Sequence, residues 1–345
     1  HNHFNGENSF ALIDSNNYKG NPPALSKLEQ LGCTKLNFVL LTHPHADHYR
    51  GLPSIMDSYP VDRFYSYPIK IEQAGRLKKL AEIYKKYTSH KTSESIRLAA
   101  LDFIRTLIMA KNTGDWQELT GPENRIRPEG FNNVELTAIL PLPKNKGEYF
   151  QMIEKGDDYV FGHEDLNNLS VALRVRYAGF EMILGADGTV TSWLGHSKEL
   201  ERTNEALSAT AVKLPHHGSK KDCGSKVLDY LFSDEEGTDY IAIISAIGNN
   251  HHPNEEVIKN LHSKGIKPYC TNLSRSCSGN VSRINTNQNL SKSLNRFVNQ
   301  TILDDENYQP CQGDICLTIN EDGKRNISTE YNFPCPYRGD FKGLV

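Results

Sequence analysis

Apolar positions in the first part of the chain predict short strands that alternate with helices. Phe10 to Asp14 and Leu36 to Leu41 are mainly apolar runs of strand length, and Val61 to Tyr67 shows an alternating pattern rich in aromatic residues. The segments that follow the first two strands, 23–31 and 51–58, are predicted to be helices. Alternation of strands with helices is typical of a layered α/β fold.

The second half continues this alternation and adds a closing hairpin. Six strands are predicted, at 132–140, 170–177, 181–184, 211–214, 240–246 and 266–270. Three helices are predicted, near 199–209, 225–232 and 255–264. Residues 315–319 and 325–331, joined by Glu321-Asp322-Gly323-Lys324, indicate the hairpin. Residues 274–305 are rich in Asn and Ser, which favours a loop.

A basic segment interrupts the rhythm between the third strand and the middle of the chain. Residues 71–87 and 93–111 are predicted helices with no strand between them. Residues 69–112 contain ten Lys and Arg but four Asp and Glu, a net charge of +6. One interpretation is an amphipathic helical hairpin with a solvated basic face. The other is a lid, or a surface that follows a phosphate backbone.

Composition narrows the class of protein. The 345 residues are long enough for a sizeable core, and we expect one domain over 1–345 with an insertion at about 69–118 and a C-terminal hairpin and tail at about 311–345. A formal net charge of −3 means that any nucleic-acid binding depends on local patches. No apolar run predicts a membrane span. The seven cysteines lack paired zinc-ribbon spacing, which favours reduced thiols over a C-terminal disulfide or structural metal. We expect a cytoplasmic location.

The densest chemistry lies directly after the strand at 36–41. His43, His45, Asp47 and His48 form a His-x-His-x-Asp-His pattern within six residues. Imidazole and carboxylate groups bind Zn²⁺, Mn²⁺ or Fe²⁺ and can leave coordination positions open for water. A metal loop is therefore predicted here.

This loop resembles the signature of the metallo-β-lactamase superfamily. The resemblance implies an αββα sandwich of two sheets flanked by helices, here with a helical insertion. It also implies that His43 and His45 bind one ion, and that Asp47 and His48 bind a second. The family pattern continues with two glycines, whereas this chain has Arg50 followed by Gly51.

Two later loops complete the predicted centre. Asp187 follows an apolar strand and is placed to bridge two ions, and either His216 or His217 completes the second ion's site, with His216 favoured. The order of four motifs resembles the metallo-β-lactamase-like domain of bacterial competence DNA-uptake channel proteins. These motifs are Asn167-Asn168-Leu169-Ser170, Gly185-Ala186-Asp187, Leu214-Pro215-His216-His217-Gly218-Ser219-Lys220 and His252-Pro253. Asn-Asn-x-Ser stands where many relatives have a third metal-binding His, which favours Mn²⁺ or weakly held Zn²⁺ unless His163 takes that place.

These motifs predict a metal-dependent phosphodiesterase, and the resemblance with the basic segment favours a nuclease acting on DNA. Two divalent ions activate a water and neutralise charge on a phosphodiester. Asp47 is expected to orient that water, and His252 or His217 to protonate the leaving oxygen. Phosphate contacts are expected from Asn168, Ser219, Lys220 and His252. The alternatives are hydrolysis of a cyclic nucleotide, lactone or lactam, and a non-catalytic binding module. Protein partners in a larger system such as bacterial defence also remain open.

Overall fold

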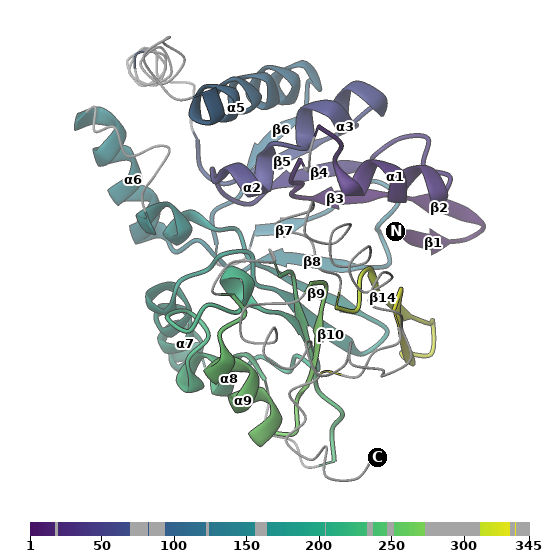
Figure 1. The fold of residues 1–345 in the computed structure, drawn as a ribbon, viewed down its shortest axis with the longest axis vertical. Helices are drawn as coiled ribbons and strands as arrows, with labels where there is room; N and C mark the ends of the chain where they lie inside the picture. Colours follow the sequence, from purple (N-terminus) through teal and green to yellow (C-terminus); the bar gives the residue numbers. More distant parts are fainter. Residues whose placement is uncertain are drawn as a thin grey trace, which may run out of the picture. The chain divides into compact units, whose positions relative to one another are not determined.

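The chain forms two compact units, His1–Arg174 and Val175–Val345. The computed structural model describes residues 1–17, 20–69, 82, 94–121, 124–155, 164–203, 205–232, 237–246, 252–272, 311–331 and 335. Each unit combines strands with helices, coloured in chain order in Figure 1. This mixed architecture confirms the predicted α/β class and is consistent with a metallo-β-lactamase-like fold. The single domain over 1–345 stays a prediction.

The first unit contains a parallel sheet that ends at the predicted metal loop. Its strands pair in the order β3 (Ala11–Ile13), β4 (Phe38–Leu41), β5 (Phe64–Ser66) and β6 (Trp116–Glu118). All four residues of β4 are buried, as expected of a central strand covered on both faces. Because β3 and β4 run parallel in register, the residues that follow them reach the same edge of the sheet.

Helices of the first unit pack beside this sheet (Figure 1). They are α1 (Pro23–Gln30), α2 (Ala46–Tyr49), α3 (Leu52–Ser58) and α5 (Glu94–Asn112). Helix α5 packs against both α2 and α3 and buries Phe103 and Leu107. The unit also contains the antiparallel pairs β1 (Asn2–Phe4) with β2 (Glu7–Ser9) and β7 (Asn124–Ile126) with β8 (Glu135–Ala138), helix α6 (Pro143–Lys155) and the 3₁₀ helix η2 (Glu164–Leu169).

The second unit is built on strands that become parallel from β10 onward. The strand order is β9 (Leu173–Tyr177), which begins at the end of the first unit, β10 (Phe180–Leu184), β11 (Ala211–Lys213), β12 (Ile241–Ile244) and β13 (Lys267–Cys270). Its helices are α7 (Val190–Thr203), α8 (Ser225–Leu231) and α9 (Glu255–Ser263). Asn254 caps α9 by accepting a hydrogen bond from the Glu256 N–H at 3.0 Å.

The predicted closing hairpin is present in the second unit. Strands β14 (Ile315–Ile319) and β15 (Arg325–Thr329) pair antiparallel. Leu317, Ile319 and Ile327 pack against a cluster formed by Phe180, Ala211 and Ile241. Alternating apolar positions of the hairpin thus cover one face of the β10–β12 strands.

Some predicted elements are displaced or missing. The helix predicted at 199–209 is wrong in position, because α7 already begins at Val190, where Thr189 Oγ1 accepts from the Ser192 N–H at 3.3 Å. Strands β6 and β7 and helix α6 were not predicted. The helix expected at 93–111 is confirmed as α5. The helix expected at 71–87, except for Glu82, and the loop expected at 274–305 lie outside the described residues. None of the described helices is both long and apolar enough to cross a membrane.

Candidate metal centre

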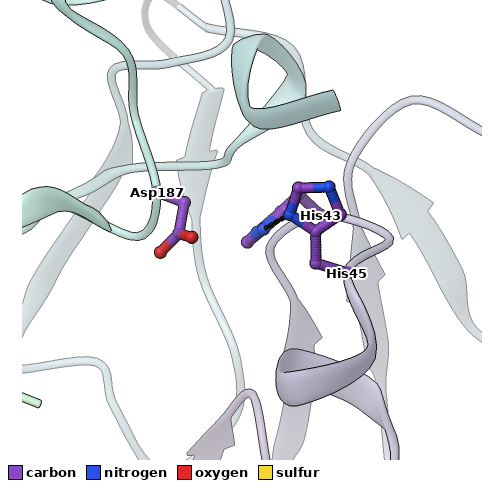
Figure 2. A group of neighbouring side chains, drawn as sticks. All are labelled: His43, His45 and Asp187. Atoms are coloured by element: carbon purple, nitrogen blue, oxygen red, sulfur yellow. Dashed lines mark hydrogen bonds between the residues drawn. The ribbon is translucent and has the colours of Figure 1, made fainter. Parts of the chain in front are cut away.

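The predicted metal loop connects the buried strand β4 to the short helix α2. His43 is fully buried, His45 is the N-cap residue of α2, and Asp47 and His48 lie within that helix. Nε2 of His43 lies 3.1 Å from Nδ1 of His45, and Figure 2 shows this contact. Two nitrogens bound about 2 Å from one tetrahedral ion would lie about 3.3 Å apart. The spacing of these imidazoles therefore fits joint coordination of a metal ion.

Asp14 and Thr42 hold the imidazoles from behind. The Thr42 hydroxyl donates to Asp14 Oδ2 at 2.7 Å and lies 3.0 Å from His43 Nδ1. His48 Nδ1 lies 2.7 Å from the same Asp14 oxygen. Partners of this kind fix the ring orientation and leave Nε2 as the ligand atom, as is usual for metal-binding histidines.

Asp14 was missed as a site residue by the sequence prediction, which placed it only at the end of a strand. Its backbone has φ of 58°, in the left-handed region, and its carboxylate also accepts from the Thr42 N–H at 2.8 Å. An aspartate at the end of a strand adjacent to the metal-loop strand was the available signal. It becomes informative only once the parallel pairing of β3 with β4 is known.

The far end of α2 is held by Ser15, which explains why Gly51 is a glycine. Ser15 donates its N–H to His48 O at 2.7 Å and accepts from the Gly51 N–H at 2.8 Å. A Cβ on Gly51 would lie 2.3 Å from Ser15 Oγ. The glycine of the family pattern is therefore required at position 51. At position 50, by contrast, the Arg50 side chain extends to Asp102, with Nε 3.3 Å from Oδ2.

In the second unit Asp187 follows β10 through a tight turn. Ala186 has φ of 46°, and a Cβ on Gly185 would lie 2.8 Å from the Lys213 carbonyl oxygen. The sequence Gly-Ala-Asp therefore still forms this turn. Gly185 allows the backbone to lie close to the Lys213 carbonyl group, and Ala186 adopts the left-handed conformation. Asp187 is 2% exposed. A buried carboxylate next to imidazole groups is a donor set that suits a divalent metal ion.

His216 and His217 lie in the same unit as Asp187 and next to its carboxylate. Both have left-handed backbones, with φ of 43° and 54°, followed by Gly218 at 77°. Of the six described non-glycine residues with positive φ, four lie in the candidate loops: Asp14, Ala186, His216 and His217. Strained backbone of this kind concentrates at functional sites. The turn directs both imidazoles towards Asp187, with His216 Nε2 3.9 Å from Oδ2 and His217 Nε2 3.8 Å from Oδ1.

The two histidines differ in burial and in partner. His217 is 7% exposed, and its Nδ1 donates to the Ser245 carbonyl oxygen at 2.7 Å. The His216 side chain is 25% exposed, and its Nδ1 lies 2.6 Å from Oδ2 of the buried Asp222. Asp222, which was also missed, accepts from the Val190 N–H at 3.0 Å and is thereby fixed.

A buried thiol lies behind this turn. Cys223 is fully buried and donates to the Pro215 carbonyl oxygen at 3.2 Å. Burial, together with the negative charges of Asp222 and Asp187, raises the pKa of the Cys223 thiol well above its usual value. The thiol therefore stays protonated and supports the turn. Cys33, Cys223 and Cys316 are free, as the sequence predicted for thiols.

The predicted phosphate-binding residues occupy different environments. His252 lies beside His216, with ring centroids 5.3 Å apart. Ser219 is buried and donates its N–H to His216 O at 2.9 Å. Lys220 is exposed and paired with Glu256 at 2.5 Å. In the first unit, Asn168 is half-buried and its carbonyl oxygen accepts from Asn145 Nδ2 at 2.9 Å. His163 lies outside the described residues.

Comparison with known families agrees with this geometry. Residues 13–140 match the model of the metallo-beta-lactamase superfamily, which confirms the resemblance over the segment that contains Asp14 and the metal loop. No curated protein matches the chain. The superfamily segment and the His/Asp donor set support a metal-dependent hydrolase. The narrower resemblance to competence-protein domains stays a prediction.

Proposed function

We propose that the protein is a metal-dependent phosphodiesterase, a nuclease acting on DNA, in which both histidine-rich loops serve one dinuclear centre. One observation carries the proposal. Nδ1 of His43, of His48 and of His217 each lies within 3.0 Å of an oxygen partner. Each ring is thereby oriented so that Nε2 remains the ligand atom. Histidines that only filled space would not need this shared arrangement.

We divide the predicted ligands between two ions. In the first unit, His43 and His45 would hold one ion, and Asp47 and His48 the other. In the second unit, Asp187 would complete the first set and His217 the second. Imidazole with carboxylate suits Zn²⁺ or Mn²⁺, and the three protein ligands in each group leave room for water and substrate.

This assignment gives the two adjacent histidines different roles. His217 is the buried member and fits a metal ligand, the second of the two sequence alternatives. His216 is more exposed, lies beside His252 and is held by Asp222. We assign His216 and His252 to the substrate, with one of them delivering the proton that the leaving oxygen requires.

Bound divalent ions would supply an activated water and would neutralise negative charge on a phosphodiester. Asp47, half-buried beside His48, would orient that water through its carboxylate. Ser219 would contribute a hydrogen-bond donor to phosphate oxygens. Lys220 contributes less in its present arrangement because Glu256 neutralises it.

Support for a nucleic-acid substrate comes from charge. The segment 69–112 has a net charge of +6 in a chain of net charge −3. A segment with this much positive charge favours a polyanion over a small neutral lactone or lactam. The order of motifs shared with DNA-uptake domains points to DNA.

The test is cleavage of DNA by purified protein supplied with Mn²⁺. His45→Ala and Asp187→Ala should each abolish nicking of plasmid DNA while the circular dichroism spectrum stays unchanged. His3→Ala removes an exposed imidazole outside the centre and is the matched control. Hydrolysis of cyclic nucleotides or lactones without polynucleotide cleavage would replace the nuclease with a small-molecule hydrolase. A chain that binds no divalent ion would instead be a binding module.

A further inference from the structure

The metal loop is attached to helix α5, which lies in the predicted insertion, through Arg50, the residue that stands where the family pattern has a glycine. Arg50 is the C-cap residue of α2, directly after the Asp47-His48-Tyr49 segment. Its Nε lies 3.3 Å from Oδ2 of Asp102, which belongs to α5. The side chains are 29% and 20% exposed, so the charges are partly shielded from water and interact more strongly than a fully solvated pair.

A second contact joins the same two helices. Tyr49 is 1% exposed and its ring centroid lies 5.0 Å from that of Phe103. The apolar contact and the ion pair act side by side at the end of α2.

Helix α2 needs such support because it is only four residues long. One turn of helix has too few internal hydrogen bonds to be stable alone. Asp14 and Ser15 fix its side facing the sheet, through His48. The last residues of α2, Tyr49 and Arg50, are in addition held by α5, a helix of 19 residues that buries Ala100, Phe103 and Leu107 and is therefore well anchored.

We propose that Arg50 and Asp102 are positioning residues, through which the inserted helix α5 holds Asp47 and His48 in the orientation required for a metal ion. The inference rests on the metal-holding role of the loop given above, and goes beyond it by assigning a function to the insertion. In this view Arg50 is an adaptation to the insertion rather than a loss of a family feature. Removal of the ion pair would leave the ligands present but less well oriented.

The chain offers a matched control on the same helix. Arg105 of α5 pairs with Asp57 of α3 at 2.8 Å, so this ion pair also fastens α5 to the unit without touching the metal loop. If α5 only contributes stability, removing either ion pair should have the same consequences. If α5 positions the ligands, only removal of Arg50–Asp102 should change metal binding.

The experiment is a double-mutant cycle on full-length, chelator-treated protein, with Mn²⁺ binding measured by calorimetry. Arg50→Ala and Asp102→Ala should each weaken binding of one of the two Mn²⁺ ions by about three- to tenfold, and the double variant should be no worse than either single one. Arg50→Lys should restore part of the affinity. Arg105→Ala and Asp57→Ala should leave Mn²⁺ affinity within about twofold of wild type while lowering the urea midpoint.

The outcomes separate this inference from the proposed function. Failure of the wild-type protein to bind Mn²⁺ would remove the metal-holding role itself. Wild-type binding with unchanged affinity in Arg50→Ala and Asp102→Asn, a milder variant that keeps side-chain volume, would overturn the positioning role alone. Equally weakened binding in the Arg105 and Asp57 variants would also overturn it, because it would show a general decrease in stability.

Discussion

Asp14 and His48 form the contact that connects the sheet to the candidate metal centre, with Oδ2 of the carboxylate 2.7 Å from Nδ1 of the imidazole. The same oxygen receives the Thr42 hydroxyl, whose own oxygen lies 3.0 Å from His43 Nδ1. One carboxylate therefore orients two predicted ligands, one directly and one through a hydroxyl. Because the backbone N–H of Thr42 also donates to Asp14, the arrangement is fixed to the ends of β3 and β4.

The first prediction concerns Asp14→Asn. The amide keeps the shape of the side chain but removes the charge that favours the Nδ1–H tautomer of His48. We expect Mn²⁺ affinity to fall by about 10- to 100-fold, the usual effect of removing such a partner. Calorimetric titration of the chelator-treated protein measures this change. Asp57→Asn, which alters a carboxylate of the same unit that is bound to Arg105, is the control. Unchanged affinity would show that Thr42 alone suffices to orient the loop.

The second prediction separates His216 from His217. His217→Ala should reduce the number of Mn²⁺ ions bound from two to one, because the substitution removes a buried ligand. His216→Ala should retain both ions but lower the turnover number by about 10²- to 10⁴-fold, the range for a general acid or base. Metal counting on dialysed protein and a DNA cleavage assay together provide the measurements.

Asp222→Asn is the companion variant, because Asp222 Oδ2 contacts Nδ1 of His216, whereas Nδ1 of His217 donates to the Ser245 carbonyl oxygen. It should behave like a milder His216→Ala, with both ions retained. Loss of an ion in His216→Ala, with both ions retained in His217→Ala, would instead support the first sequence alternative, in which His216 is the ligand.

The sequence was sufficient to identify the candidate ligands whose pattern is local. His43, His45, Asp47 and His48 lie within six residues after an apolar strand, so their density alone indicated a metal loop. Strands β3, β4 and β5 and helix α5 followed from the apolar pattern, whereas β6 did not. The bounds of α7 did not, because its start depends on a cap at Thr189 and on Asp222, thirty-two residues away from Val190.

The positioning residues could not be predicted in the same way. Asp14 meets His48 only because β3 pairs parallel with β4, and sequence spacing does not contain that pairing. The choice between His216 and His217 depends on two successive left-handed residues, which turn adjacent side chains to different depths. Periodicity carries no information about such a turn, since neither residue is a glycine.

The third prediction concerns acid stability and His196 in α7. Burial lowers the pKa of His196 to about 4. An unfolded chain binds this proton at a pKa of about 6.5, so the stability contributed by the neutral imidazole is present above that pH and is lost as pH falls towards 4. The decrease should reach at most about 3 kcal/mol and then level off.

Urea unfolding of wild type and His196→Gln between pH 7 and pH 4 tests this. The difference between the two curves isolates His196 from the other titrating groups. Tyr230→Phe is the control, because it removes the hydroxyl next to His196 Nδ1 but leaves the imidazole in place, so its pH dependence should follow wild type. Identical pH dependence in wild type and His196→Gln would contradict the assignment.

The final prediction addresses the basic segment, whose lysines 78, 79, 85 and 86 lie outside the described residues. If they bind the DNA backbone, reversing all four to Glu should weaken DNA binding and make the logarithm of the affinity less dependent on the logarithm of salt concentration. Each phosphate group that the variant no longer neutralises should reduce the slope by about 0.9 for duplex DNA. Fluorescence anisotropy at several salt concentrations measures the slope. Reversing Lys198, Lys226, Lys259 and Lys324, exposed lysines of the second unit, gives the same change in net charge and is the matched control. A slope that changes equally in both variants would reflect net charge alone, and the segment would then be a solvated helical hairpin.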